Sequence, residues 1–358
     1  MQDCKIEHVT SATVHNLSYN SLKTLIFQNC QIYNIDQDTF LDIKNQLYHL
    51  EINANHVSAS NVSKSLTSLN KSVIRTIALR YNFWDSIPKT MFNHLSKSQL
   101  DTLTLCLFKM KHFNGFLLSG LYKLKKLTIC TEKSLESVSI RGMPSSIEQL
   151  TLSGNNLRHV PNFCTHNSAL LPNLKILNVN RNSIKKIKSW SLHCLHTLKR
   201  LLMVSNYLVI IKDNTFSQLM SLEYLVISSQ MTFIKKIEPF AFNSSTLLHL
   251  NLFNNNFDFK RTNVELIFKL CPRLKFLDLS NTVLRLGYIQ LRRMFISLTN
   301  LEVLLLTSVG IRALPSGLFP HLKSLKRLDL DGNYITGWED DPGIFMNITW
   351  MQQLNLKR

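Results

Sequence analysis

The sequence is poor in glycine and proline and has no long apolar run. Only 10 Gly and 9 Pro occur in 358 residues, which argues against a disordered or low-complexity chain. No apolar run reaches the ~18 to 20 residues that a membrane-spanning helix needs. The opening MQDCKIEHVT lacks the apolar stretch of a signal peptide. Hydrophobic residues still make up 45% of the chain, which is ample for a large buried core.

Acidic residues and catalytic motifs are also scarce. The 23 Asp and Glu oppose 41 Lys and Arg, so the net charge is +18. Such an excess favours anionic partners, namely nucleic acids, acidic glycans, lipid head groups or acidic proteins. The sequence shows no Ser-His-Asp signature, metal-ligand cluster or phosphate-binding loop. We therefore expect a protein that is not an enzyme, with no catalytic residues, no metal and no cofactor.

One pattern is repeated along the whole chain. It has the form L-x-x-L-x-L-x-x-N-x-L, which LLHLNLFNNNF (Leu247 to Phe257) and LKRLDLDGNYI (Leu325 to Ile335) match in full. Two repeats, at Leu124 and Leu222, fit only with small insertions after the strand. The spacing between successive starts is 23 to 27 residues. The first template position falls at Leu22, Leu47, Ile74, Leu100, Leu124, Ile147, Leu174, Leu198, Leu222, Leu247, Leu274, Leu301, Leu325 and Met351.

Each template position has a physical role. In L-x-L the side chains alternate, so the leucines point inward and each repeat adds one short strand to a parallel sheet. The asparagine follows the strand, where its amide can bond backbone groups that have left the sheet. The bulkier return segments make the stack of strands curve. The asparagine position is occupied as expected at Asn55, Asn82, Asn155, Asn182, Asn206, Asn255 and Asn333.

Some repeats depart from the asparagine rule. Cys30 and Thr282 are small polar replacements, whereas Phe108 and Val309 cannot make these hydrogen bonds, so we expect local irregularity at both. A phenylalanine near the nineteenth position should fill the back of the core in several repeats, at Phe40, Phe92, Phe216 and Phe319.

The expected fold class is an α/β solenoid. We predict one continuous leucine-rich-repeat horseshoe, with a parallel β-sheet on the concave face and irregular or short helical return segments. Residues 1–21 would form an N-terminal cap or capping strand. Residues 22–358 would form about fourteen repeats, the last incomplete and without a C-terminal cap.

The repeats resemble the ectodomain of a Toll-like receptor over about residues 20 to 358. The closest stretches are LEVLLLTSVGIRALPSGLFPHLKSL and LTLSGNNLRHVP. The resemblance implies an innate-immune pattern-recognition receptor that binds its ligand non-covalently and forms a homodimer or heterodimer to signal. It also implies an extracellular or endosomal-luminal location. The sequence shows no Toll/interleukin-1 receptor domain and no cysteine-rich C-terminal cap. We therefore expect a partial or engineered ectodomain, whose parent is anchored in the membrane by a segment outside this chain.

A second class of protein remains open. A leucine-rich-repeat binding module, such as an adaptor, a matrix protein or a cytokine-binding receptor, would use the concave face to bind another protein. The partner would then be a protein ligand instead of an anionic microbial ligand, whether nucleic acid, acidic glycan or lipid.

The positions of the cysteines within the repeats suggest two disulfides. Cys106 and Cys130 share the seventh template position of adjacent repeats, whose strands lie about 4.8 Å apart, within the Cα range of a disulfide. Cys164 and Cys194 lie one repeat apart on return segments and form the second candidate pair.

The remaining cysteines suggest other states. Cys4 could pair with Cys30 in an N-terminal cap, but we favour a buried thiol for Cys30, and Cys271 is predicted to be a free core thiol. The stretches CTH (Cys164 to His166) and HCLH (His193 to His196) have the residue types of a zinc site. No C-x-x-C accompanies them, so we do not predict one.

Sequons for N-glycosylation are about as frequent as chance predicts. None lies on a strand or just after one between Ile147 and Ile335, which leaves that surface open to a ligand. The five acceptor positions are Asn16, Asn61, Asn70, Asn243 and Asn347.

Basic residues follow the eleventh template position of many repeats. Because this position lies on the same edge in each repeat, they should form a stripe along one lateral flank. The stripe would either bind an anion or merely keep the flank soluble. His159 would add charge as the pH falls below the usual histidine pKa of about 6.5. The repeat at Leu198 interrupts the row with Val209 and Ile210. The candidate ligand-binding residues are Arg158, His159, Lys185, Lys186, Lys235, Lys236, Lys260, Arg261, Arg285 and Arg312.

The strand face has no such excess of one sign. Its basic residues Lys126, Arg181, Arg200 and Arg327 are offset by the acidic residues Glu51, Glu223, Asp278 and Asp329. A ligand on the concave face, a ligand on the flank and a dimer interface on either surface all remain open from the sequence.

Overall fold

The structure is a computed structural model that forms two compact units. Unit 1 comprises Met1–Leu157 and Pro161–Asn178, and unit 2 comprises Arg158–Val160 and Val179–Arg358. The residues that the structure describes are 1–3, 5–15, 17, 21–166, 168–257, 259, 263–282, 284, 286–314, 317, 319–336 and 349–357.

Unit 1 is built on one parallel sheet. Position four of the template stays in register from strand to strand, as in the pairs Leu25 with Leu50 and Leu127 with Leu150. The strands pair in the order β2 (Thr24–Gln28), β4 (His49–Asn53), β5 (Thr76–Asn82), β6 (Thr102–Leu107), β8 (Lys126–Cys130), β10 (Gln149–Thr151) and β11 (Ile176–Asn178).

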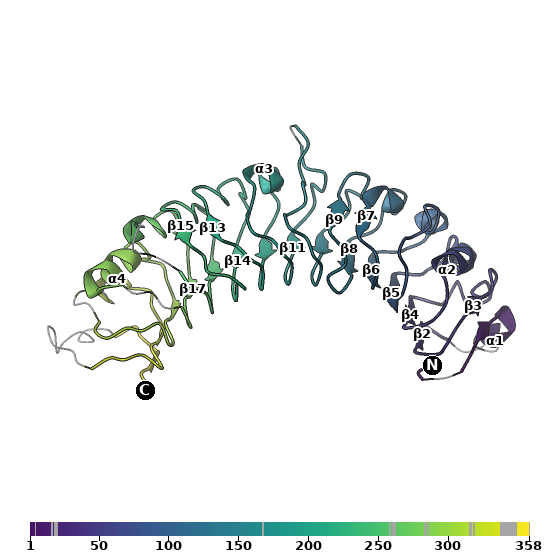
Figure 1. Cartoon of the computed structure of the whole chain (residues 1–358), viewed down its shortest axis with the longest axis horizontal. Helices are drawn as coiled ribbons and strands as arrows, with labels where there is room; N and C mark the ends of the chain where they lie inside the picture. Colours follow the sequence, from purple (N-terminus) through teal and green to yellow (C-terminus); the bar gives the residue numbers. More distant parts are fainter. Residues whose placement is uncertain are drawn as a thin grey trace. The chain divides into compact units, whose positions relative to one another are not determined.

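The return segments of unit 1 are short and irregular. In Figure 1 the sheet strands of this unit lie on the inner side of its arc and the return segments on the outer side. Outer strands pair in parallel, β1 (His8–Val9) with β3 (Asn34–Ile35) and β7 (His112–Asn114) with β9 (Ser137–Ser139). The helices are α1 (Ser11–His15), α2 (Ala59–Ser65) and the 3-10 turns η1 (Leu66–Leu69), η2 (Asn93–Lys97) and η3 (Gly115–Leu118).

Unit 2 repeats the same design. Its sheet strands pair in the order β12 (Arg200–Leu202), β14 (Tyr224–Val226), β16 (His249–Asn251), β17 (Phe276–Asp278), β18 (Val303–Leu305), β19 (Arg327–Asp329) and β20 (Gln353–Asn355). Outside this sheet, β13 (Ile210–Ile211) pairs with β15 (Lys236–Ile237). The helices are α3 (Ser189–Leu192), α4 (Tyr288–Phe295) and the turns η4 (Val264–Leu266) and η5 (Phe319–His321). The prediction of a leucine-rich-repeat solenoid with a parallel sheet is confirmed.

Phenylalanines fill the back of the core, as the sequence predicted. Phe40, Phe92, Phe216 and Phe319 are all buried. In unit 2 Phe216 belongs to a longer stack, in which the ring of Phe242 lies 6.2 Å from that of Phe216 and 6.0 Å from that of Phe268. These three repeats therefore pack their rings against one another, and the stack couples neighbouring repeats.

The asparagine ladder performs its predicted role. Asn255 is buried, its Nδ2 donates to the carbonyls of Ile227 at 2.6 Å and Leu252 at 2.8 Å, and its Oδ1 accepts from the Gln230 amide at 2.9 Å. One amide thus satisfies backbone groups of its own repeat and of the preceding one. The other predicted asparagines are buried too, at Asn55, Asn82, Asn155, Asn182, Asn206 and Asn333.

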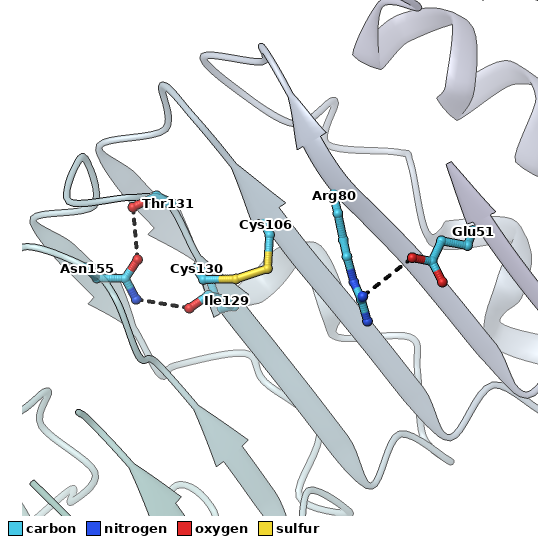
Figure 2. Close-up of a disulfide and its surroundings, with 7 residues drawn as sticks. All are labelled: Glu51, Arg80, Cys106, Ile129, Cys130, Thr131 and Asn155. Carbon is cyan, nitrogen blue, oxygen red and sulfur yellow. Dashed lines mark hydrogen bonds and ion pairs between the residues drawn. A yellow bond between two sulfur atoms is a disulfide. The ribbon is translucent and has the colours of Figure 1, made fainter. Parts of the chain in front are cut away.

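Two inserted repeats use a different residue for this role. Gln230 donates from Nε2 to the Met203 carbonyl at 2.8 Å and accepts from the Leu208 amide at 3.2 Å. In the other case the Thr131 hydroxyl accepts from the Leu135 amide at 2.7 Å and donates to Asn155 at 2.8 Å, and Figure 2 shows the second of these bonds. The sequence reasoning missed both, although Gln230 stands at the ninth position of its repeat.

The structure tests one of the two apolar replacements. At Phe108 the expected irregularity is present, since the pairing of β5 with β6 shifts register between Arg80 and Asn82. At Val309 the expectation stays a prediction, because the pairing of β18 with β19 ends at Leu305. Asn333 of the next repeat accepts from the Val309 amide at 3.2 Å, which is the usual bond of a ladder asparagine to the repeat before it.

The cysteines confirm two predictions and correct one. Cys106 and Cys130 form a disulfide with their Cα atoms 4.4 Å apart, on adjacent strands (Figure 2), and Cys271 is a buried free thiol whose pKa burial raises to about 12. Cys30 is disulfide-bonded, so the thiol favoured from the sequence is wrong. The ladder position tolerates this state because the asparagine of the next repeat, Asn55, supplies the acceptor for the Cys30 amide.

Some cysteine predictions stay open. Cys164 and Cys194 are each disulfide-bonded, as their proposed pairing requires. Cys4 lies outside the described residues. Among the helices that the structure describes, none combines the length and the apolar character needed to cross a membrane.

Candidate functional site

A group of basic side chains lies on the flank of unit 2. We call Arg158, His159, Lys185, Lys186 and Lys188 the cationic cluster. Arg158 and His159 follow Asn155, and the three lysines follow Asn182 in the next repeat, so both segments leave the strand on the same edge. Arg158, His159, Lys185 and Lys186 are exposed. The Lys188 ammonium lies 4.8 Å from the centroid of the exposed Trp190 ring.

The pKa of His159 responds both to burial and to this positive charge. Burial lowers this pKa first, and the charges of Lys188, Lys186 and Arg158 lower it further. The expectation that His159 gains charge at its usual pKa is therefore wrong, since in the free protein it stays neutral to a lower pH. A bound anion would oppose these charges and would raise the pKa of His159 again.

Acidic side chains compensate the charge at the opposite edge of the strands. There, at the second template position, Glu148 binds Lys175 at 2.7 Å, and Glu302 binds both Lys275 at 2.8 Å and Lys326 at 2.7 Å. Hydrogen bonds from these two lysines lower the pKa of Glu302 to about 2.

Within the part of the chain that the structure describes, no ion pair involves a residue of the cationic cluster. Lysines at the strand-start edge are thus neutralised by their neighbours, whereas those of the cluster keep their charge for a partner.

The other basic flank residues are not all equivalent to the cluster. Lys235 and Arg312 are exposed, whereas Lys236 is ion-paired with Glu238 at 3.2 Å. Lys260, Arg261 and Arg285 lie outside the described residues. The uniform stripe predicted from the sequence is therefore concentrated, among the described residues, at the two repeats that carry the cluster.

The strand face of unit 2 carries a stack of rings that the sequence reasoning missed. The Arg200 guanidinium lies 4.6 Å from the centroid of Tyr224, whose ring lies 4.8 Å from that of His249, which in turn lies 4.0 Å from that of Phe276. All four occupy the third template position, and sheet pairing places them side by side. We call them the ring ladder.

The ring ladder makes unfolding sensitive to acid. Burial, with the nearby charge of Arg200, lowers the pKa of His249 to about 4. Between the usual pKa of about 6.5 and about 4, the unfolded chain binds a proton that the folded chain refuses, so stability falls with falling pH. Between pH 7 and pH 4 we expect the His249→Phe variant to lose about 1 to 2 kcal/mol less stability than the wild type. This figure is reduced because the ring is partly exposed.

Urea unfolding at several pH values checks this prediction. The comparison is the pH dependence of the variant against that of the wild type, since carboxylates contribute to both. Parallel stability curves for the two proteins down to pH 4 would contradict it.

The described sequons differ in how accessible the acceptor amide is. Asn61 lies in α2, where its side chain accepts from the Ile35 amide at 2.7 Å and donates to Asn34. Asn70 is exposed, and Asn243 donates to Asn214 at 2.7 Å. Asn16 and Asn347 lie outside the described residues. Glycosylation stays a prediction at all five sites, and Asn70 is the one with an exposed acceptor that is free of recorded side-chain bonds.

Comparison with known proteins shows which repeat proteins this chain is similar to. The model of the Leucine rich repeat family matches residues 172–231 and 299–358. Toll-like receptor 3 of Boselaphus tragocamelus is 30% identical over 272 residues, which cover 71% of this chain and 30% of that receptor. This chain thus has leucine-rich repeats and is similar to the Toll-like receptors. The resemblance drawn from the repeats is thereby confirmed.

Other relatives share the repeat architecture. Podocan of Mus musculus is 29% identical over 244 residues, covering 59% of this chain and 38% of podocan. A chain in the structure of the Toll–Spatzle complex of Drosophila matches with a TM-score of 0.75 at 18% identity, covering 99% of this chain and 45% of that one. The chain spans about a third of the length of these curated relatives. In the described residues, no group of three His, Cys, Asp or Glu side chains is placed to hold a metal ion.

Proposed function

We propose that this chain is the ligand-binding part of a pattern-recognition receptor and binds a polyanion through the cationic cluster. The observation that carries the proposal is a group of basic side chains without acidic partners among the described residues, whose charges add to burial in lowering the pKa of His159. The similarity to Toll-like receptor 3 supports the receptor class. The parent protein would act in the extracellular space or the endosomal lumen, without enzymatic activity, and would dimerise to signal.

The chemistry of the cluster favours an extended anion over a single small one. The cluster draws on two consecutive repeats, and its exposed lysines lie on a surface and not in an enclosed pocket. Phosphate or sulfate groups repeated along a polymer could meet several of these side chains at once. Neutralising each group would release condensed counterions, which makes the affinity depend steeply on salt.

Removing two charges from the cluster should weaken binding to a polyanion. We expect the Lys185→Gln/Lys186→Gln variant to bind a double-stranded DNA fragment roughly tenfold more weakly at ~0.1 M salt. The slope of log K against log salt should become shallower by roughly 1.8, since about 0.9 is lost per phosphate contact on double-stranded DNA. Titration at several salt concentrations, with heparin as a second polyanion of different chemistry, measures both quantities.

The matched control removes the same charge from the compensated edge. Lys275→Gln/Lys326→Gln lies in the same unit and changes the net charge equally, but its lysines already bind Glu302. It should leave the affinity within about twofold, because its lysines are not free to meet phosphate. Equal weakening by both variants would show a general charge effect, and an unchanged affinity of the cluster variant would remove the site from this flank.

A further inference from the structure

A second surface of unit 2 has the opposite character. On β12, β14, β17 and β18 the strand face presents half-buried apolar side chains, and on β16, between β14 and β17, it presents the half-buried ring of His249. Beside the ring ladder lie the cross-strand pairs of Leu202 with Val226 and of Phe276 with Val303. Leu305 continues the surface next to Asp278. We call these residues with the ring ladder the apolar strip.

The corresponding face of unit 1 is different. At the fifth template position it carries Thr104, Thr128 and Thr151, and Thr102 occupies the third. Threonine hydroxyls are readily solvated, so that face needs no partner. A strip of rings and aliphatic side chains on an exposed sheet face is the kind of surface that marks a binding site.

A carboxylate without a counter-ion borders the apolar strip. Asp278 is only 7% exposed, and its oxygens accept from the Ser280 amide at 2.9 Å and the Asn251 amide at 3.2 Å. Its cross-strand neighbours, Asn251 and Leu305, carry no charge. Burial raises the pKa of Asp278, hydrogen bonds from Ser280 and Asn251 oppose the rise, and the charge of Asp329 adds to it.

The strand face of unit 2 carries Arg200 and Arg327 as well as Asp278 and Asp329. Of the two carboxylates, Asp278 is the one without an ion pair among the described residues. Asp329 lies two strands further along, 9% exposed, and its nearest cation is Arg327 at 3.6 Å. A cation from outside the chain would complete the environment of Asp278 and would lower its pKa. Such a cation, together with apolar contacts, is what a basic peptide provides.

The geometry of the rings also limits the ligand. Within the ladder Arg200 and His249 cover the two faces of Tyr224, and Tyr224 and Phe276 cover those of His249. Because these faces are occupied, a sugar or a base cannot stack on Tyr224 or His249, and their ring edges remain for contact. The ladder spans about 14 Å across four strands, the length of roughly four extended peptide residues. Ring edges and aliphatic groups over that length suit peptide side chains.

We propose that the apolar strip binds a basic peptide segment of a protein ligand, with its apolar side chains on the ring ladder and a lysine or arginine at Asp278. This site is independent of the polyanion site, because it lies on the strand face and its unpaired charged group is a carboxylate. A chain with both surfaces can hold a polyanion and a basic protein at the same time.

The experiment pans random linear peptides, displayed on phage, against the intact chain. Enriched peptides should combine lysine or arginine with leucine or aromatic residues. Synthetic copies of them should then lose about tenfold or more in affinity to each of the variants Asp278→Asn and Tyr224→Ser/Phe276→Ser, since these remove the charge partner and the ring edges. Circular dichroism and thermal melting check that each variant is folded. If the double variant does not fold, the near-isosteric Asp278→Asn variant still tests the proposal.

Two matched variants locate the effect. Thr104→Ala/Thr128→Ala changes the fifth template position of unit 1, and Lys185→Gln/Lys186→Gln changes the cationic cluster. Both should leave peptide affinity within about twofold. Loss of peptide binding in the cluster variant alone would show that the peptides bind the flank, and would overturn this proposal without affecting the test with DNA.

Other outcomes also decide the question. No enrichment, enrichment of acidic peptides, or equal affinity for wild type and Asp278→Asn would overturn the proposal. Sedimentation velocity tests whether a second copy of this chain binds the apolar strip instead. A wild-type dimer that Tyr224→Ser/Phe276→Ser converts to a monomer would assign the strip to self-association instead of a basic peptide.

Discussion

Asn255→Ala should lower the free energy of unfolding by about 3 to 5 kcal/mol, because three buried backbone groups lose their hydrogen-bond partner at once. These groups are the carbonyls of Ile227 and Leu252 and the amide of Gln230. None can reach water at this site, since Asn255 is only 3% exposed. Urea unfolding measures the change, and amide exchange at Gln230 should accelerate more than at distant repeats.

The neighbouring Asn256 provides the control. It is exposed, and its backbone carbonyl accepts from the Ile234 amide without help from the side chain. Asn256→Ala should therefore change stability by no more than about 0.5 kcal/mol. If the two variants were equally stable, the ladder asparagines would be dispensable, and the repeat would be held by its apolar residues alone.

Phe242→Ala should lower the free energy of unfolding by about 3 to 5 kcal/mol, because it leaves a cavity in the core. Phe242 is fully buried between the rings of Phe216 and Phe268, so truncation removes contacts to the repeats on both sides. Stability in a repeat protein depends on such nearest-neighbour interfaces. Thermal and urea unfolding should show a lower midpoint, with loss of cooperativity between the two flanking repeats.

An exposed phenylalanine in the same repeat is the control that separates the effect of burial from the effect of residue type. Phe233 is 44% exposed, and Phe233→Ala should cost no more than about 1 kcal/mol. Phe242→Leu should recover most of the lost stability, because it refills part of the cavity. A small effect of Phe242→Ala would mean that neighbouring repeats close over the gap.

The sequence alone was sufficient to predict the repeat scaffold of this protein. Its strands, their register, the asparagine ladder and the phenylalanine stack all follow from one template repeated at 23 to 27 residues. Equivalent positions of successive repeats must become neighbours in a parallel sheet, which is why the disulfide of Cys106 with Cys130 could be predicted. Departures from the template were harder to predict, because the replacing residue can stand at another position, as Thr131 does when it accepts from the Leu135 amide.

The two candidate surfaces depended on contacts between repeats. Arg200, Tyr224, His249 and Phe276 are isolated residues of mixed type in the sequence, and only the packed sheet shows that their side chains stack.

Tertiary structure also separated the basic residues, since Lys275 and Lys326 meet Glu302, whereas Lys185 and Lys186 have no recorded acidic partner in the described residues. The template determines which positions share a face. Which side chains stack and which charges pair depends on two neighbouring repeats, because each repeat supplies only one partner of a ring contact or an ion pair.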